Sequence, residues 1–142
     1  MQMKKMNNKG FTLIELLAVL VILVVIMSIA IPSITSSVER SKAKQREQVI
    51  NIVKAQAELY ADKHKNSLKN DTTITIRDLV CEGYLTLEEA KDPMNENFTI
   101  DIRFTVGSNN SLVSEEHGGF KVALKDENGN DIDEVEYCRN YN

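Results

Sequence analysis

The stretch KGFTLIELLAVLVILVVIM, residues 9–27, decides how this chain is built. Residues 16–27 are twelve consecutive apolar side chains, and the segment from Phe11 to Ile31 has 21 residues. At a rise of about 1.5 Å per residue, a helix of that length spans about 30 Å, the thickness of a bilayer's hydrocarbon core. Within this segment stands one carboxylate, Glu15, whose insertion into lipid costs up to ~3 kcal/mol at the bilayer centre.

Composition and charge separate the chain into an apolar start and a polar remainder. With 142 residues, 42% apolar and 27% charged, the chain has the composition of one folded domain. Residues 1–10 carry three lysines and no acid, whereas residues 67–142 carry seven basic and sixteen acidic residues, a net charge of −9. Because this acidic half repels phosphate backbones, we expect no direct nucleic-acid partner.

Three interpretations of the apolar segment compete. A secretory signal cleaved after Ala30 is supported by the leading lysines and by the small residues before that site, and a permanent single-pass anchor is equally long. Neither gives Glu15 a use. In the third, cleavage between Gly10 and Phe11 creates an α-amino group four residues before Glu15, on the same helix face. That ammonium, on the same chain or a neighbouring copy, would neutralise the carboxylate.

The residues Lys9-Gly10-Phe11-Thr12-Leu13-Ile14-Glu15-Leu16 resemble the prepilin motif of type IV pilins and pseudopilins. The resemblance implies that a prepilin peptidase cuts after Gly10 and methylates the Phe11 amine, which stays cationic. It also implies that Glu15 pairs with the Phe11 amine of an adjacent subunit. The helix would serve first as a membrane anchor and later as the filament core.

The resemblance implies a structural subunit of a type IV pilus or pilus-like filament. A pseudopilin of a type II secretion or competence DNA-uptake system is the alternative within the family. A membrane-anchored binding module that does not polymerise and a small secreted enzyme cut after Ala30 are alternatives of other classes. The expected partners are copies of itself, other pilins, prepilin peptidase, inner-membrane assembly machinery and membrane lipid. The head would lie outside the cytoplasmic membrane, and later on a surface filament.

A single long helix is predicted from about Phe11 to about Lys65, because Pro32 is the only Gly or Pro between positions 11 and 82. Pro32 removes the hydrogen bond to the Ser28 carbonyl and predicts a kink. Residues 33–48 are mostly polar. After them an apolar arc must pack on the rest of the chain, and it comprises Val49, Ile50, Ile52, Val53, Ala55, Ala57, Leu59 and Tyr60.

The remaining residues predict a small antiparallel sheet on that helix, an α+β fold. Short helical segments are expected at 75–82, stopped by Gly83, and at 86–93. Strands are expected at 98–106, at Phe120–Leu124 and around Val135 and Tyr137, with Asn128-Gly129 as a hairpin turn. The predicted divisions are a leader (1–10), a membrane helix (11–31), its amphipathic continuation (32–65) and a head (66–142).

Two cysteines, Cys81 and Cys138, make an even count in a chain expected to be exported. This favours a disulfide over a metal site or redox pair, with two unpaired thiols as the alternative. In the chain-entropy model, a loop of this size stabilises the fold by up to ~4 kcal/mol.

Nothing in the sequence predicts catalysis, a metal or a cofactor. His64 and His117 are expected to be exposed, and no nucleophile, phosphate or metal motif surrounds them. DENGND, 126–131, begins like a calcium loop, but Asp131 replaces the required glycine and Tyr137 the final glutamate. A hairpin turn explains this stretch.

A basic cluster, Arg40, Lys42, Lys44 and Arg46, follows the membrane segment. A solvated helix face is the simplest interpretation. Contact with anionic lipid headgroups, or with acidic residues of the 67–142 region in a neighbouring subunit, is the alternative.

Overall fold

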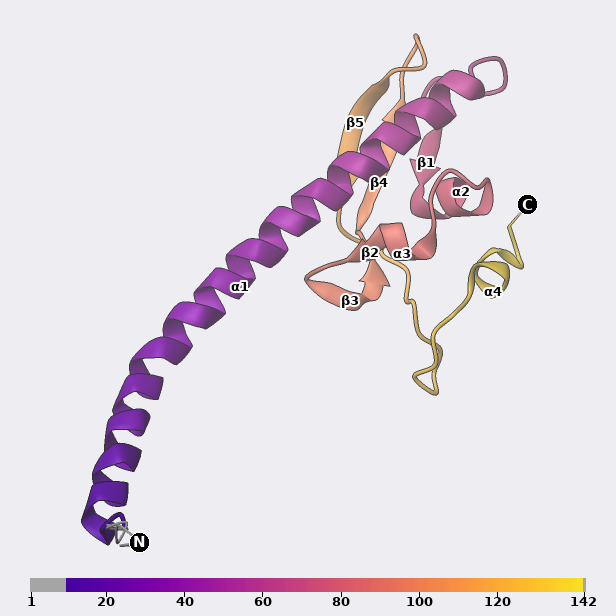
Figure 1. Ribbon diagram of the computed structural model, residues 1–142. Helices are drawn as coiled ribbons and strands as arrows, with labels where there is room; N and C mark the ends of the chain where they lie inside the picture. The colour runs from indigo at the N-terminus through magenta and orange to yellow at the C-terminus, as the bar shows by residue number, and fades with distance from the viewer. Residues whose placement is uncertain (1–9, 142) are drawn as a thin grey trace, which may run out of the picture. The chain divides into compact units, whose positions relative to one another are not determined.

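A computed structural model describes residues 10–141 of the chain. Its internal contacts divide it into two units, one ending at Arg40 and one beginning at Ser41. Helix α1, Leu13–Lys63, belongs to both (Figure 1). Of the predicted leader, residues 1–10, only Gly10 lies within the described residues.

Helix α1 continues through Pro32, so the long helix predicted from about Phe11 to about Lys65 is confirmed. Pro32 has no N–H, and the Ser28 carbonyl therefore lacks its usual intrahelical donor. One turn later, the Thr35 hydroxyl donates to the carbonyls of Ile31, at 3.3 Å, and Pro32, at 3.0 Å. Such back-bonding often accompanies helix bending. The kink itself stays a prediction.

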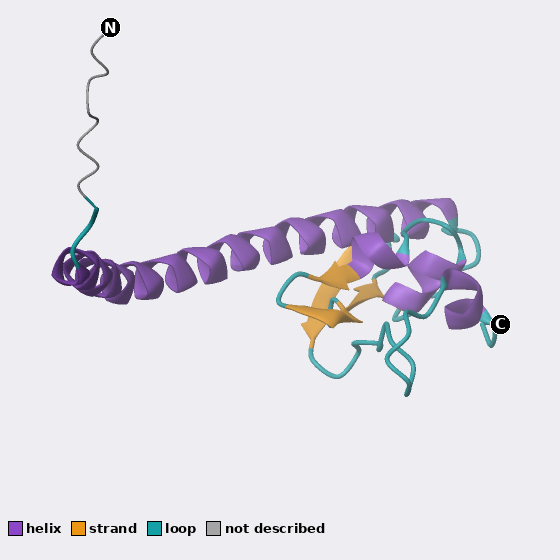
Figure 2. Cartoon of the chain, turned by 60° about the horizontal axis from the view of Figure 1, so that its bottom comes forward, coloured by secondary structure: helices purple, strands orange, loops and turns teal. Residues whose placement is uncertain are grey.

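The second unit contains a three-stranded antiparallel sheet in the order β1-β4-β5. These strands are Thr73–Thr75, Ile102–Val106 and Leu112–His117. Two further short strands, β2 (Lys91–Asp92) and β3 (Asn95–Thr99), form a separate antiparallel pair. The fold is α+β, with a small antiparallel sheet beside the C-terminal half of α1, as predicted (Figures 1 and 2).

The core of this unit lies between α1 and the sheet. Helix α1 contributes Val53, Ala57, Tyr60 and Ala61, and the central strand contributes Ile102, Phe104 and Val106. Only part of the predicted apolar arc is buried, because Ile52 remains 46% exposed and Leu59 43% exposed. At 100° per residue, these two side chains lie about 100° or more around the helix from the Val53–Ala57 face.

Both predicted short helices are present, as α2 (Ile76–Cys81) and α3 (Leu87–Ala90). Each begins with a reciprocal capping box, in which a threonine and an acidic residue three positions later bond to each other's backbone N–H. These pairs are Thr75 with Asp78 and Thr86 with Glu89. Gly83 follows α2 with φ +80°, a conformation that favours glycine at a helix end.

The prediction of one strand over 98–106 is wrong, because the chain changes partners in its middle. Residues up to Thr99 pair with β2, and residues from Ile102 pair with β1 and β5. At the break, the Ile100 N–H donates to the Ala90 carbonyl at 2.7 Å. Thr99, predicted to face water, is 1% exposed because its hydroxyl accepts a hydrogen bond from the Val122 N–H.

The prediction of a strand over Phe120–Leu124 is also wrong. The Phe120 and Val122 N–H groups donate to side chains, the Asp101 carboxylate and the Thr99 hydroxyl, and not to a strand backbone. Only an isolated bridge, Phe98 to Ala123, forms there. The unpredicted strand β5 occupies the sheet edge next to β4.

The last predicted strand is instead a helix, α4 (Glu134–Cys138). Asp133 caps it by accepting a hydrogen bond from the Glu136 N–H at 2.7 Å. The turn at Asn128-Gly129 is present, with Gly129 at φ +83°, although only an isolated bridge closes it. The disulfide Cys81–Cys138 joins α2 to α4, and so ties the short helix to a second helix and not to a strand.

Candidate assembly site at the start of the long helix

Glu15 is the third helical residue of α1, and Thr12 stands at the N-cap position. The Thr12 N–H donates to Glu15 Oε2 at 2.9 Å, and the Glu15 N–H donates to Thr12 Oγ1 at 3.3 Å. This is a capping box, which satisfies two backbone N–H groups that have no partner inside the helix. Glu15 also places negative charge at the positive end of the helix dipole.

The sequence analysis did not predict the role of Thr12, although the sequence contains a local pattern that indicates it. Threonine followed three residues later by glutamate, at the start of an apolar run, is the signature of a capping box. In the single chain, this local bond gives the carboxylate of Glu15 one partner. It does not use up the carboxylate, because two oxygens offer about four acceptor positions.

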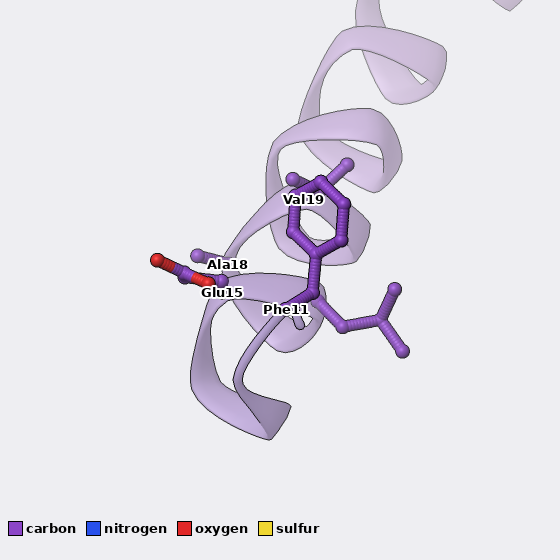
Figure 3. A pocket seen from close by; sticks show the side chains of 5 residues that line it. Phe11, Glu15, Ala18 and Val19 are labelled. Atoms are coloured by element: carbon purple, nitrogen blue, oxygen red, sulfur yellow. The ribbon is translucent and has the colours of Figure 1, made fainter. Parts of the chain in front are cut away.

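Phe11 lies just before the helix and is 92% exposed. In Figure 3 its ring extends along the helix toward Val19, while the Glu15 carboxylate points outward from the helix. Phe11, Glu15, Leu16, Ala18 and Val19 line a shallow, mainly apolar depression. Cleavage after Gly10 would place an α-ammonium on Phe11, immediately before the N-cap residue.

The site lies on a helix whose side chains nothing in the described chain covers. Every residue from Gly10 to Gln45 is exposed, including the large apolar side chains of the 13–31 segment. This part of α1 is long and apolar enough to cross a membrane, and none of that apolar segment is buried within the chain. A surface of this kind requires lipid or other protein around it.

The structure separates the four residues of the basic cluster. Arg46 Nε lies 3.1 Å from Asp92 Oδ2, a carboxylate that is largely buried. Arg40, Lys42 and Lys44 are exposed, and within residues 10–141 they make no ion pair. Arg46 therefore holds α1 to the β2 region of the head, and the other three residues are available to external partners.

The two histidines differ in their surroundings. His64 is half-buried, contrary to the prediction, because its ring stacks on Tyr60 with 4.2 Å between centroids. His117 is exposed as predicted, and its Nε2 lies 2.8 Å from Glu115 Oε1. Within the described part of the chain, neither imidazole ring is hydrogen-bonded to a serine or cysteine side chain; the Ser67 hydroxyl donates only to the His64 backbone carbonyl, at 3.2 Å.

The 126–131 loop uses its oxygens for its own turn. The Asp126 carboxylate accepts hydrogen bonds from the Asn128 N–H, at 2.8 Å, and from the Asn130 N–H, at 2.9 Å. Hydrogen bonds from Asn130 and Asn128 lower the pKa of Asp126. Between residues 10 and 141, no three or more His, Cys, Asp or Glu side chains form a group suited to hold a metal.

Comparison with known proteins identifies one matching family model and several similar proteins. The family model described as the prokaryotic N-terminal methylation motif matches residues 5–31. The chain is 36% identical over 89 residues to the competence protein ComGC of Streptococcus pneumoniae serotype 4, which covers 63% of this chain and 77% of that protein. It is 38% identical over 80 residues to the competence protein ComGC of Bacillus subtilis strain 168, covering 56% of this chain and 76% of that protein.

A third relative, the ComG operon protein 3 homolog of Bacillus licheniformis, is 36% identical over 80 residues, covering 56% of this chain and 77% of that protein. No solved structure matches the chain significantly. The motif that contains Gly10, Phe11 and Glu15 thus lies within the matched methylation motif. With this similarity over more than three quarters of the relatives' length, the chain belongs to the ComGC family of competence pseudopilins, which are type IV pilin-like proteins.

Proposed function

We propose that this protein is a structural subunit of the filament of a competence DNA-uptake system. Of the filaments left open by the sequence, the similarity to ComGC favours the competence pseudopilus over an adhesion or motility pilus and over a secretion pseudopilus. The observation that carries the proposal is the uncovered helix of residues 13–31, which begins with the methylation motif and has no partner in its own described chain.

The helix first anchors the subunit in the cytoplasmic membrane, with the head outside. Prepilin peptidase then removes residues 1–10 and methylates Phe11, and the inner-membrane assembly machinery brings subunits together. Apolar side chains of residues 13–31 exchange lipid for the helices of other pilins, so the filament core stays free of water. After assembly, the subunit lies in an extracellular filament.

Glu15 directs this assembly through charge. In an apolar surrounding, an unpaired carboxylate is costly, and an ammonium with good geometry offsets that cost. A carboxylate that already accepts one hydrogen bond, from the Thr12 N–H, has positions left for the Phe11 amine of an adjacent subunit. A subunit that docks with its Phe11 amine away from Glu15 leaves both charges unpaired, so the pair selects the correct position.

The head has a structural role in this proposal, without enzymatic activity, cofactor or direct contact with DNA. Its net charge of −9 over residues 67–142 repels nucleic acid. Attraction of DNA is therefore assigned to other components of the uptake system.

Deletion of the gene tests the proposed function. We expect transformation frequency to fall by more than 100-fold and to return when the intact protein is supplied from a plasmid. Surface filaments sheared from competent cells should contain the protein. Normal transformation in the deletion strain, together with absence of the protein from sheared filaments, would contradict the proposal.

A further inference from the structure

One face of α1 in the second unit is exposed and carries no charged side chain between residues 41 and 59. Its positions alternate at intervals of four and three residues, and we call them the seam: Ser41, Gln45, Gln48, Ile52, Ala55 and Leu59. All six are exposed, and the two large apolar members, Ile52 and Leu59, are 46% and 43% exposed. Between residues 41 and 141, the head covers the other side of the helix, at Val53 and Ala57.

The spacing of the seam is that of helices packed against helices. A repeat of seven residues with contacts at two of them keeps one stripe of a helix facing a partner helix. Residues 41–59 include six charged side chains, and none of them falls on the seam. In the sequence, the same alternation continues back through Val38 and Ile34, and in the forward direction it reaches its first charged residue at Asp62, in the last turn of α1. A face that only met water would not need to exclude charge.

We propose that the seam binds the seam of a second copy of this chain, with the two helices parallel and in register, as a membrane-bound dimer that precedes assembly. The parallel direction follows from the proposed membrane anchor, because the same apolar segment brings both helices into the membrane the same way round. Anchoring also raises the local concentration of each copy around the other.

The order of residue types along the seam favours the in-register arrangement. In register, Gln45 and Gln48 face their own counterparts and can bond to each other, and Ile52 and Leu59 also meet their counterparts. A shift by one heptad places Ile52 against Gln45 and so buries an amide beside an apolar side chain. An unsatisfied buried amide is unfavourable, and polar residues at such positions are known to fix register.

Charges beside the seam complement each other in the same arrangement. In a parallel two-helix pair, the residue just before Gln45, Ile52 or Leu59 faces the residue five places later in the sequence of the partner helix. By this rule Glu58 meets the second copy's Lys63, and two-fold symmetry gives the pair twice. Lys44 meets Val49, so these flanking positions oppose no like charges. The next position of the alternation, Asp62, lies at the end of α1 beside Lys63. In the single chain, Lys63 Nζ lies 5.6 Å from the Tyr84 ring centroid. Lys63 is nevertheless exposed, so its ammonium is accessible to Glu58 of a second copy.

The cysteine content of the protein makes the test direct. Both native cysteines are joined in the Cys81–Cys138 disulfide, so an introduced thiol is the only free one. In full-length Ile52→Cys protein in cell membranes, mild oxidation should give a disulfide-linked dimer. The matched control is Glu47→Cys, an exposed position about 140° around the helix from Ile52. We expect at least ten times more dimer from Ile52→Cys.

Two outcomes overturn the proposal. Equal or absent dimer in the two variants, with the head intact by protease resistance, shows that the seam does not bind a copy. Dimers that form only between Ile52→Cys and Gln45→Cys chains, and not within Ile52→Cys alone, show helices out of register.

A charge reversal provides the second test. Glu58→Lys should reduce the Ile52→Cys dimer several-fold, and adding Lys63→Glu should restore it; no reduction overturns the assignment of this pair. The proposed function is measured separately, by transformation frequency. A strain that transforms normally without the dimer refutes the helix pair alone.

Discussion

Residues 13–40 of α1 and the rest of the described chain differ in whether they bury their own apolar side chains. From Leu13 to Arg40, every side chain is exposed, including more than a dozen large apolar ones, and no part of the described chain covers them. From Ser41 onward, the chain buries its own core around Phe104 and closes it with a disulfide. The first region therefore depends on lipid or other subunits for its stability, whereas the head carries its own.

The two regions also differ in how their charged residues are paired. In the head, Arg46 and Asp92 satisfy each other within one chain. In the helix, Glu15 accepts a hydrogen bond from the local Thr12 N–H within the described residues, and in the proposed filament its second partner is the α-ammonium that cleavage after Gly10 would create. Variants that affect one region and spare the other test this division.

The largest effect is expected at Glu15. In Glu15→Gln, the glutamine can still complete the capping box, but it cannot pair with an ammonium. We expect membrane insertion and cleavage after Gly10 to continue, and filaments measured by shearing and immunoblot to fall by more than 100-fold.

The matched control for Glu15→Gln is Thr12→Ala, which removes the cap at a cost of about 1 kcal/mol and keeps the charge. This variant should still form filaments. If Glu15→Gln assembles normally and Thr12→Ala does not, Glu15 acts as a helix cap and the charge pair plays no part.

The disulfide should affect only the head. Replacing both cysteines, Cys81→Ser with Cys138→Ser, should lower its free energy of unfolding by about 2–4 kcal/mol, because the cross-link restricts the unfolded chain. Denaturant unfolding of the full chain in detergent, followed by tyrosine fluorescence, measures this change. Insertion of α1 into membranes should be unchanged. An unchanged unfolding midpoint would show that the core alone supports the head.

The sequence predicted some elements of the fold and not others, and the difference depends on how far apart the interacting residues are. The long helix and the motif at Glu15 depend on neighbours within four positions, so local patterns were sufficient to predict them. The strands depended on distant partners. Phe120, Val122 and Leu124 alternate as in a strand, but their N–H groups are bound by Asp101, Thr99 and Asn97.

Strand β5 was missed for the opposite reason. It lies at the sheet edge and has few apolar residues, so it shows no alternation of apolar and polar positions. The helix α4 had a local signal, Asp133 three residues before Glu136, which the apolar spacing of Val135 and Tyr137 obscured. In the candidate site, Thr12 was missed although Gly10, Phe11 and Glu15 were identified.

A smaller effect is expected from Asp101 in acid. Burial raises the pKa of this carboxyl, but hydrogen bonds from the Phe120 and Gly119 N–H groups outweigh it and hold the pKa below the usual 3.8. A lowered pKa in the folded state contributes stability above the ordinary pKa, and this contribution is lost as pH falls through the folded value. Asp101→Asn should therefore lose less stability than the parent protein between about pH 5 and pH 2.

The control for this pH effect is Asp62→Asn, at an exposed position on α1, which should keep the parent's dependence. Thermal melts across this pH range give the comparison. Identical pH dependence in the parent and Asp101→Asn would show that the glycine loop at 118–119 does not rely on the charge of Asp101.

The N-terminus of the protein isolated from cells tests most directly whether proteolysis supplies the partner of Glu15. Intact mass and N-terminal sequencing of chains sheared from competent cells should show a chain that begins at Phe11 and carries one methyl group. The variant Gly10→Leu should retain the leader and stay in the membrane. A filament subunit that begins at Met1, at Ile31 or at any residue other than Phe11 would contradict the account.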